Sequence, residues 1–210
     1  MRVDVDLTTE DAARDLQAIE GPGIAGLAFC FSAPANYVLR TDVGSPEALW
    51  SRGEPFSHRS VNEAVAALGP PFRVVEHGQP MRRPDEFPNA FRETEISAWK
   101  GTSALPSSIF DVDGTDSVGA LALNGMPLIS EVRAGGAAVW PFQPLQDDGL
   151  TCVEVFPRSL WARLNPKEDS KSKTHPRRRA AFVKHVRESG TSVNQRLAQT
   201  FQEEERAFDA

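Results

Sequence analysis

The sequence predicts an α/β fold, because short apolar runs of strand length alternate with stretches that have helical features. Two of these runs, at 137–142 and 150–156, flank residues 143–149, which are rich in the proline, aspartate and glycine of turns. A third run, at 23–31, lies between two prolines and is apolar throughout, as a central strand covered on both faces would be. We therefore expect helices packed on a mixed or parallel sheet.

Helix-start residues predict the first helices of the chain. Thr8 or Thr9 can cap a helix that ends near Gly21, because a hydroxyl at the N-cap accepts a hydrogen bond from a free backbone N–H. Ser45 precedes a second, short helix, and the S-V-N-E pattern of residues 60–63 is a capping box that predicts a third.

The later part of the chain predicts helices around one irregular segment. Residues 117–135 have a helical pattern that Gly125 and Pro127 are expected to break into two pieces. Two more helices are expected over 177–188 and 191–210. Residues 70–106 are rich in proline, arginine and glutamate, and predict an irregular insertion.

Composition and length predict one water-soluble domain that covers residues 1–210, since 40% of the 210 residues are hydrophobic. No apolar run reaches the ~20 residues that a membrane span requires, and the amino terminus lacks the apolar stretch of a signal peptide. These features predict a cytoplasmic protein with no membrane partner. Cys30 and Cys152 lie in apolar runs, which favours two buried, reduced thiols.

Glu154 is the charged residue that most needs an explanation, because Val153 and Val155 flank it inside an apolar run. A carboxylate in a buried strand costs several kcal/mol unless it is paired, exposed at one face or bound to a metal. Asp111 is a second carboxylate of interest, since it opens a D-V-D-G-T-D stretch that resembles the start of a calcium loop. The glutamate that should complete such a loop is missing.

Charge patterning leaves two interpretations open. The net charge of −6 argues against a protein whose whole surface binds nucleic acid. Basic residues nevertheless cluster between 163 and 187, either as a phosphate-binding patch or as a solvated loop and helix face. The arginines expected to contact phosphate are Arg82, Arg83, Arg92, Arg177, Arg178 and Arg179.

Several motifs, in the same order along the chain, resemble a bacterial family of predicted nucleases called domain of unknown function 429. The similar stretches are G-L-A-F-C-F-S at 26–32, P-F at 71–72, R-R-P at 82–84, F-R-E-T-E at 91–95, S-I-F at 108–110, G-M-P-L at 125–128, V-W-P-F at 139–142, V-E-V-F-P-R at 153–158 and A-F-D-A at 207–210. The resemblance implies a ribonuclease-H-like fold, with a mixed sheet flanked by helices.

The resemblance also implies phosphodiester hydrolysis with two Mg²⁺ or Mn²⁺ ions held about 3.5–4 Å apart by carboxylates. The acids of this chain that match the family pattern, and are expected to bind metal and act in catalysis, are Glu154 and Asp209. Ala28 stands where the family strand carries an acid, and Arg206 stands where its last helix carries another. An alanine cannot bind a metal ion, so this departure predicts impaired or lost activity.

Only 22 residues precede residue 23, whereas the resemblance predicts several strands there, so we expect a domain that lacks its first strands and is incomplete at both ends. The unpaired sheet edge that results would favour a homodimer. Three functions remain open: a metal-dependent nuclease, a non-catalytic module that binds nucleic acid or protein on the same fold, and a degenerate copy with no independent function.

Overall fold

The computed structural model describes residues 8–52, 61–76, 79–100, 105–113 and 117–156, together with residues 180, 183, 184 and 188. The chain divides into two compact units. One consists of Leu7–Lys100 and Leu105–Val155, and the other of Met1–Asp6, Gly101–Ala104 and Phe156–Ala210. Almost all described residues belong to the first unit.

Two small parallel sheets confirm the α/β class. One has three strands in the order β1 (Gly23–Leu27), β5 (Leu150–Glu154) and β4 (Ala138–Trp140), and both of its pairings are parallel. The other pairs β2 (Arg73–Val74) with β3 (Asp111–Val112), also in parallel. The strands expected over 137–142 and 150–156 are therefore present, each a little shorter than its apolar run.

The prediction of a central strand over 23–31 is wrong. In the described part of the chain β1 has a neighbour on one side only, and the central strand is β5. Ile24 on β1 is 71% exposed, whereas Cys30 and Phe31, which follow the strand, are buried. The apolar run thus combines an edge strand with a buried segment after it. A homodimer formed through this edge stays a prediction.

Helix starts agree with the capping residues. The Oγ1 atom of Thr8 accepts a hydrogen bond from the Asp11 N–H at the start of α1 (Thr9–Gln17). The Oγ atom of Ser45 accepts one from the Ala48 N–H at the start of α3 (Pro46–Arg52). Helix α4 (Val61–Leu68) lies where the capping box predicts it. Helix α2 (Ala35–Arg40), which follows Pro34, was not expected from the sequence.

Helix α6 (Val118–Ala134) is continuous, which corrects the expectation that Gly125 and Pro127 divide it. Burial explains the difference, because much of the helix contributes to the core and this packing outweighs the local cost of glycine and proline. Gly125 lies against the ring of Phe29, and a β-carbon at that position would collide with it. The glycine therefore permits a close helix approach rather than ending the helix.

The segment 70–106, expected to be irregular, contains regular elements in its described part. Besides β2 it holds the 3-10 helix η2 (Pro88–Ala90) and the α-helix α5 (Glu93–Trp99). Its proline and arginine content concealed them, because both helices are less than two and a half turns long and have little room for an apolar period.

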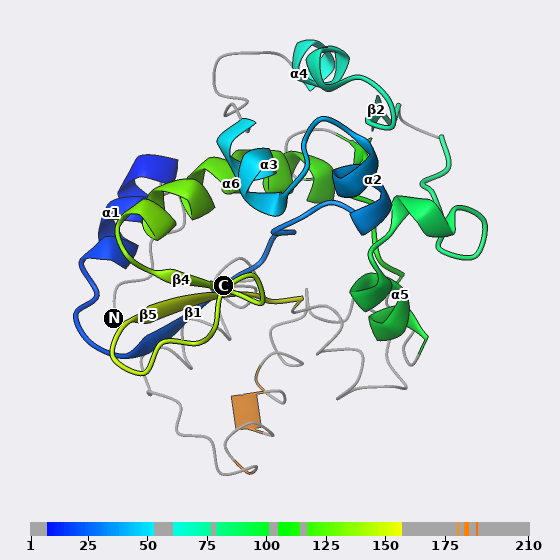
Figure 1. Cartoon of the computed structure of the whole chain (residues 1–210). Helices are drawn as coiled ribbons and strands as arrows, with labels where there is room; N and C mark the ends of the chain where they lie inside the picture. The colour runs from blue at the N-terminus through cyan, green and yellow to red at the C-terminus, as the bar shows by residue number, and fades with distance from the viewer. Residues whose placement is uncertain are drawn as a thin grey trace. The chain divides into compact units, whose positions relative to one another are not determined.

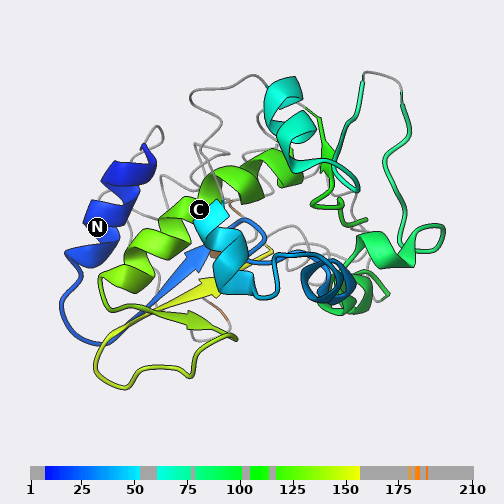
Figure 2. The ribbon, with the colours of Figure 1, turned by 45° about the horizontal axis from the view of Figure 1, so that its top comes forward.

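Helix α6 is the element around which the unit is packed. Figures 1 and 2 show it lying across the three-stranded sheet with α1 and α3 beside it. Its first turn approaches β3, since Gly119 lies close to the Ile109 and Asp111 carbonyls.

The core contains aromatic rings and both cysteines. The rings of Tyr37 and Phe72 each pack edge to face on Phe110, and both cysteines are free and buried. The prediction of two buried thiols is confirmed.

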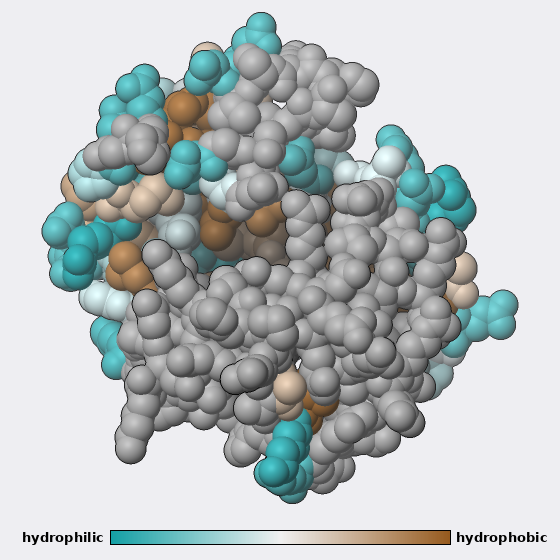
Figure 3. Space-filling model, turned by 180° about the vertical axis from the view of Figure 1, so that it is seen from behind, coloured by the Kyte–Doolittle hydropathy of each residue, from teal (hydrophilic) through white to brown (hydrophobic). Residues whose placement is uncertain are grey.

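The surface is mixed in character. Figure 3 shows hydrophilic and hydrophobic residues side by side where described residues are visible from behind. Within the described ranges, no helix has the length and apolar content to span a membrane. In the second compact unit, Ala180, Val183, Lys184 and Glu188 are helical, as expected for 177–188.

Candidate functional site

Glu154 lies at the carboxyl end of the central strand β5, opposite Leu27 of β1. Its Oε2 atom accepts hydrogen bonds from the Arg92 Nη1 atom at 2.5 Å and from the Phe31 N–H at 2.9 Å. Its Oε1 atom accepts a further one from Arg92 Nη2. The carboxylate that the sequence left unexplained is therefore paired, and its main partner is a guanidinium.

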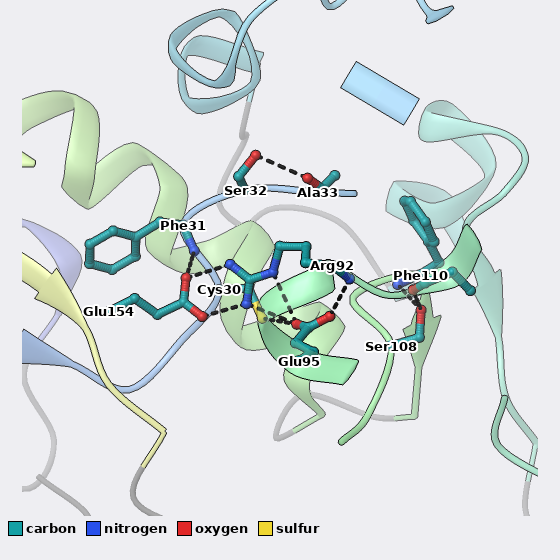
Figure 4. A network of polar contacts seen from close by, with 10 residues as sticks. Cys30, Phe31, Ser32, Ala33, Arg92, Glu95, Ser108, Phe110 and Glu154 are labelled. Carbon is teal, nitrogen blue, oxygen red and sulfur yellow. Dashed lines mark hydrogen bonds and ion pairs between the residues drawn. The ribbon is translucent and has the colours of Figure 1, made fainter. Parts of the chain in front are cut away.

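Arg92 precedes α5 and contacts two carboxylates at once (Figure 4). In addition to Glu154 it binds Glu95, whose Oε1 atom accepts hydrogen bonds from Arg92 Nη2 at 2.8 Å and from Nε at 3.1 Å. The backbone N–H of Arg92 donates to the Oε2 atom of Glu95 at 2.8 Å. Glu95 thus stabilises the first turn of α5 as an N3 acid and also orients the guanidinium.

The environment of Arg92 favours its charged form. The side chain is only 15% exposed, and burial alone would lower its pKa. The neighbouring Glu154 and Glu95 carboxylates outweigh burial and raise the pKa of Arg92 above its usual range. The guanidinium therefore remains a permanent cation in this pocket.

Cys30 completes the cluster. Its thiol donates a weak hydrogen bond to Glu95 Oε1, with an Sγ–Oε1 distance of 3.4 Å. Burial raises the pKa of Cys30 well above its ordinary value, and the nearby Glu95 and Glu154 carboxylates add to the effect, while Arg92 opposes it. Cys30 is thus held as a neutral thiol, the form that is a poor nucleophile.

The charges of this cluster define its chemistry. One guanidinium, that of Arg92, faces the two carboxylates of Glu95 and Glu154. Ala28 directly follows Leu27 at the same end of the sheet and adds no carboxylate. Within the described ranges, no group of three or more histidine, cysteine, aspartate or glutamate side chains is arranged to hold a metal.

A second cluster surrounds Asp111 on the small sheet. Arg73 lies opposite Asp111 in the β2–β3 register and donates from Nε to Asp111 Oδ1 at 2.8 Å. The N–H of Arg82 donates to Asp111 Oδ2 at 2.8 Å, and its guanidinium lies within ion-pair distance of Oδ1. This carboxylate is thus engaged by arginines, and its sequence likeness to a calcium loop has no counterpart in its contacts.

The predicted site residues are distributed over separate places. Glu154 and Arg92 contact each other, although the sequence predicts different roles for them. Arg82 belongs to the Asp111 cluster, and Arg83 is exposed with Asp85 as its ion-pair partner. The remaining predicted residues lie outside the described residues: Asp209, Arg177, Arg178 and Arg179. Nucleic-acid binding by the arginines stays a prediction.

Two residues of these clusters were missed by sequence reasoning. Glu95 stands three residues after Arg92, at the position from which an acid stabilises a helix start, and this spacing could have revealed it. Arg73 had no comparable signal, because its pairing with Asp111 depends on the register of two strands that are far apart in sequence.

Comparisons with protein-family models, with curated proteins and with solved structures find no match to this chain.

Proposed function

We propose that this chain is a non-catalytic nucleic-acid-binding module on a ribonuclease-H-like fold, in which Glu154 has a structural role. The observation that carries the proposal is the pairing of Glu154 with Arg92 and with the Phe31 N–H. Both carboxylate oxygens accept hydrogen bonds from Arg92, and Oε2 accepts a second one from the Phe31 N–H. The parallel order of β1, β5 and β4 is compatible with such a fold.

The energetic argument concerns what metal binding would displace. A Mg²⁺ ion at Glu154 would have to displace the Arg92 guanidinium. The displaced guanidinium would then be a second cation close to the metal ion. Separating a buried ion pair costs about 3–5 kcal/mol. Hard divalent ions need several anionic oxygens, and Ala28 provides none at this end of the sheet. The Arg92 pairing therefore opposes metal binding at Glu154.

Nucleic acid is the partner that the positive charges favour. Basic residues cluster between 163 and 187 in the sequence, while the whole chain carries a net charge of −6. Binding through such a local patch would depend on phosphate contacts and would weaken steeply as salt is added.

A metal-dependent nuclease is the second candidate. It is favoured by the place of Glu154, since the carboxyl ends of parallel strands are where α/β proteins gather functional groups. In this interpretation Glu154 and Asp209 would hold Mg²⁺ or Mn²⁺, and Arg92 would have to move away from Glu154 before the metal could bind.

Titration of Mn²⁺ into the wild-type chain and into Glu154→Gln distinguishes the two candidates. The binding module predicts no saturable heat in either protein, salt-sensitive binding of a labelled oligonucleotide and no cleavage with Mg²⁺ or Mn²⁺. Saturable Mn²⁺ binding that Glu154→Gln abolishes, together with metal-dependent cleavage, would establish the nuclease instead. A folded chain that binds no oligonucleotide at low salt would contradict the proposal.

A further inference from the structure

The β2–β3 sheet places two arginines on one fully buried carboxylate. The Asp111 side chain is 0% exposed, whereas that of Arg73 is 36% exposed. Besides its Nε contact, Arg73 donates from Nη2 to Asp111 Oδ2 at 3.4 Å. Arg82 approaches Asp111 Oδ1 from Nε at 3.5 Å. One buried anion therefore orients two cations.

Backbone groups fix the same two side chains. Arg73 Nη2 donates to the Pro80 carbonyl at 3.1 Å, and Arg82 Nη2 donates to the Pro71 carbonyl at 3.0 Å. Each guanidinium thus has at least two anchoring contacts, so little side-chain freedom remains to be lost when a ligand binds. The Nη1 atoms of both arginines have no acceptor in the described part of the chain.

The charges of this cluster do not balance. One guanidinium neutralises Asp111, and the second leaves an excess positive charge on the cluster. Burial lowers the pKa of Arg82, and the charge of Arg73 lowers it further, against the opposing effect of Asp111. A structural role alone would need only one arginine, whereas a second, immobilised guanidinium is what recognition of an oxyanion needs.

We infer that Arg73 and Arg82, held by Asp111, form a binding site for a phosphate group of a nucleic-acid backbone. This inference rests on the proposed function and adds a location to it. The ligand is an oxyanion because the Nη1 atom of each charged guanidinium can donate a charge-assisted hydrogen bond to one of its oxygens. Contacts of this kind to phosphate oxygens position the backbone and carry no sequence information.

The test is the fluorescence anisotropy of a labelled single-stranded oligonucleotide, measured over a range of salt concentrations. Arg73→Lys keeps the charge and so keeps Asp111 neutralised, but it removes the Nη1 donor. We expect it to weaken binding about tenfold, the loss of one good charged hydrogen bond. We expect Arg82→Gln to weaken binding similarly and to reduce the salt slope by about 0.7, the value for one phosphate contact on a single strand. The matched control is Arg14→Gln, an exposed arginine of α1 paired with Asp11, which should bind like the wild type.

The double variant Arg73→Gln with Asp111→Asn separates geometry from charge. It retains one guanidinium and the same excess positive charge, but it lacks the carboxylate that orients Arg82. Weaker binding by this variant, with an unchanged melting temperature, supports the oriented site.

The outcomes for the proposed function and for this site differ. If the wild type binds the oligonucleotide and the three cluster variants bind equally well, the phosphate site is wrong while the binding function stands. If the wild type binds no oligonucleotide, the binding function fails. A titration with inorganic pyrophosphate then tests the cluster by itself, and loss of pyrophosphate binding in Arg82→Gln would preserve the anion site. No pyrophosphate binding would overturn it.

Discussion

Arg92 and Glu154 are 62 residues apart in sequence, and the Nη1 atom of one lies 2.5 Å from the Oε2 atom of the other. The contact joins the start of α5 to the end of the central strand β5. The guanidinium supplies the opposite charge that a carboxylate inside an apolar strand requires.

Removing Arg92 should destabilise the fold strongly. Arg92→Gln leaves Glu154 and Glu95 close together with no cation between them. We expect a loss of about 3–5 kcal/mol in the free energy of unfolding, measured by urea denaturation. Arg83→Gln is the control, since Arg83 is exposed and should change stability by less than about 0.5 kcal/mol. Equal midpoints for the two variants would contradict a structural role for Arg92.

A variant that lacks the Arg92 guanidinium should be able to bind a metal ion in its place. The double variant Arg92→Ala with Ala28→Asp removes the resident cation and adds a carboxylate directly after β1, at the end of the sheet where Glu154 lies. We expect its melting temperature to rise when Mn²⁺ is added, because a ligand that binds only the folded state stabilises it. The wild type should show no such rise. A rise of equal size in the wild type would mean that Arg92 does not exclude the metal.

The buried thiols should make stability fall at alkaline pH. Burial raises the pKa values of Cys30 and Cys152 above the ordinary 9.0, so the folded state keeps protons that the unfolded chain releases. Their contribution is therefore fully present below pH 9 and is lost as the pH rises further, by about 1.4 kcal/mol per unit for each thiol. Denaturation of wild type and Cys30→Ala between pH 8 and 10.5 checks this, and the variant should lose less stability. Parallel curves would indicate that Cys30 ionises normally.

A larger side chain at position 125 should destabilise the fold, because Gly125 packs against Phe29. Gly125→Ala normally improves helix propensity by up to about 1 kcal/mol, but here the new methyl group meets the Phe29 ring. We expect a net loss of about 1–3 kcal/mol, and Phe29→Leu in the same chain should recover part of it. Leu121→Ala serves as the control on the exposed side of α6. A gain in stability from Gly125→Ala alone would show that the ring can move aside.

The fold could be predicted from sequence where the signal is local. Ser45 and Thr8 cap their helices as expected, because an N-cap acts through atoms three residues away. The apolar runs at 137–142 and 150–156 contain strands, as their length and apolar composition predict. Periodicity could not show that the run at 23–31 stops being a strand after Leu27, since its last residues are buried without being in the sheet.

The candidate site was predicted only in part. The sequence identified Glu154 as a carboxylate in need of a partner, and its apolar neighbours were sufficient for that. It did not identify Arg92 as the partner, because the pairing depends on where α5 lies relative to β5. Arg73 and Asp111 show the same limit, as their contact follows from strand register alone.

The position of β5 in the sheet has a consequence for synthesis of the chain on the ribosome. In the described part of the chain, β1 and β4 each pair with β5, and the Phe31 N–H bonds to a side chain 123 residues later. Strand β1 therefore leaves the ribosome long before its partner exists, and such long-range pairing makes folding slow. Until β5 emerges, the apolar residues of β1 are exposed to other nascent chains, which makes this interval the one in which a chaperone would matter most.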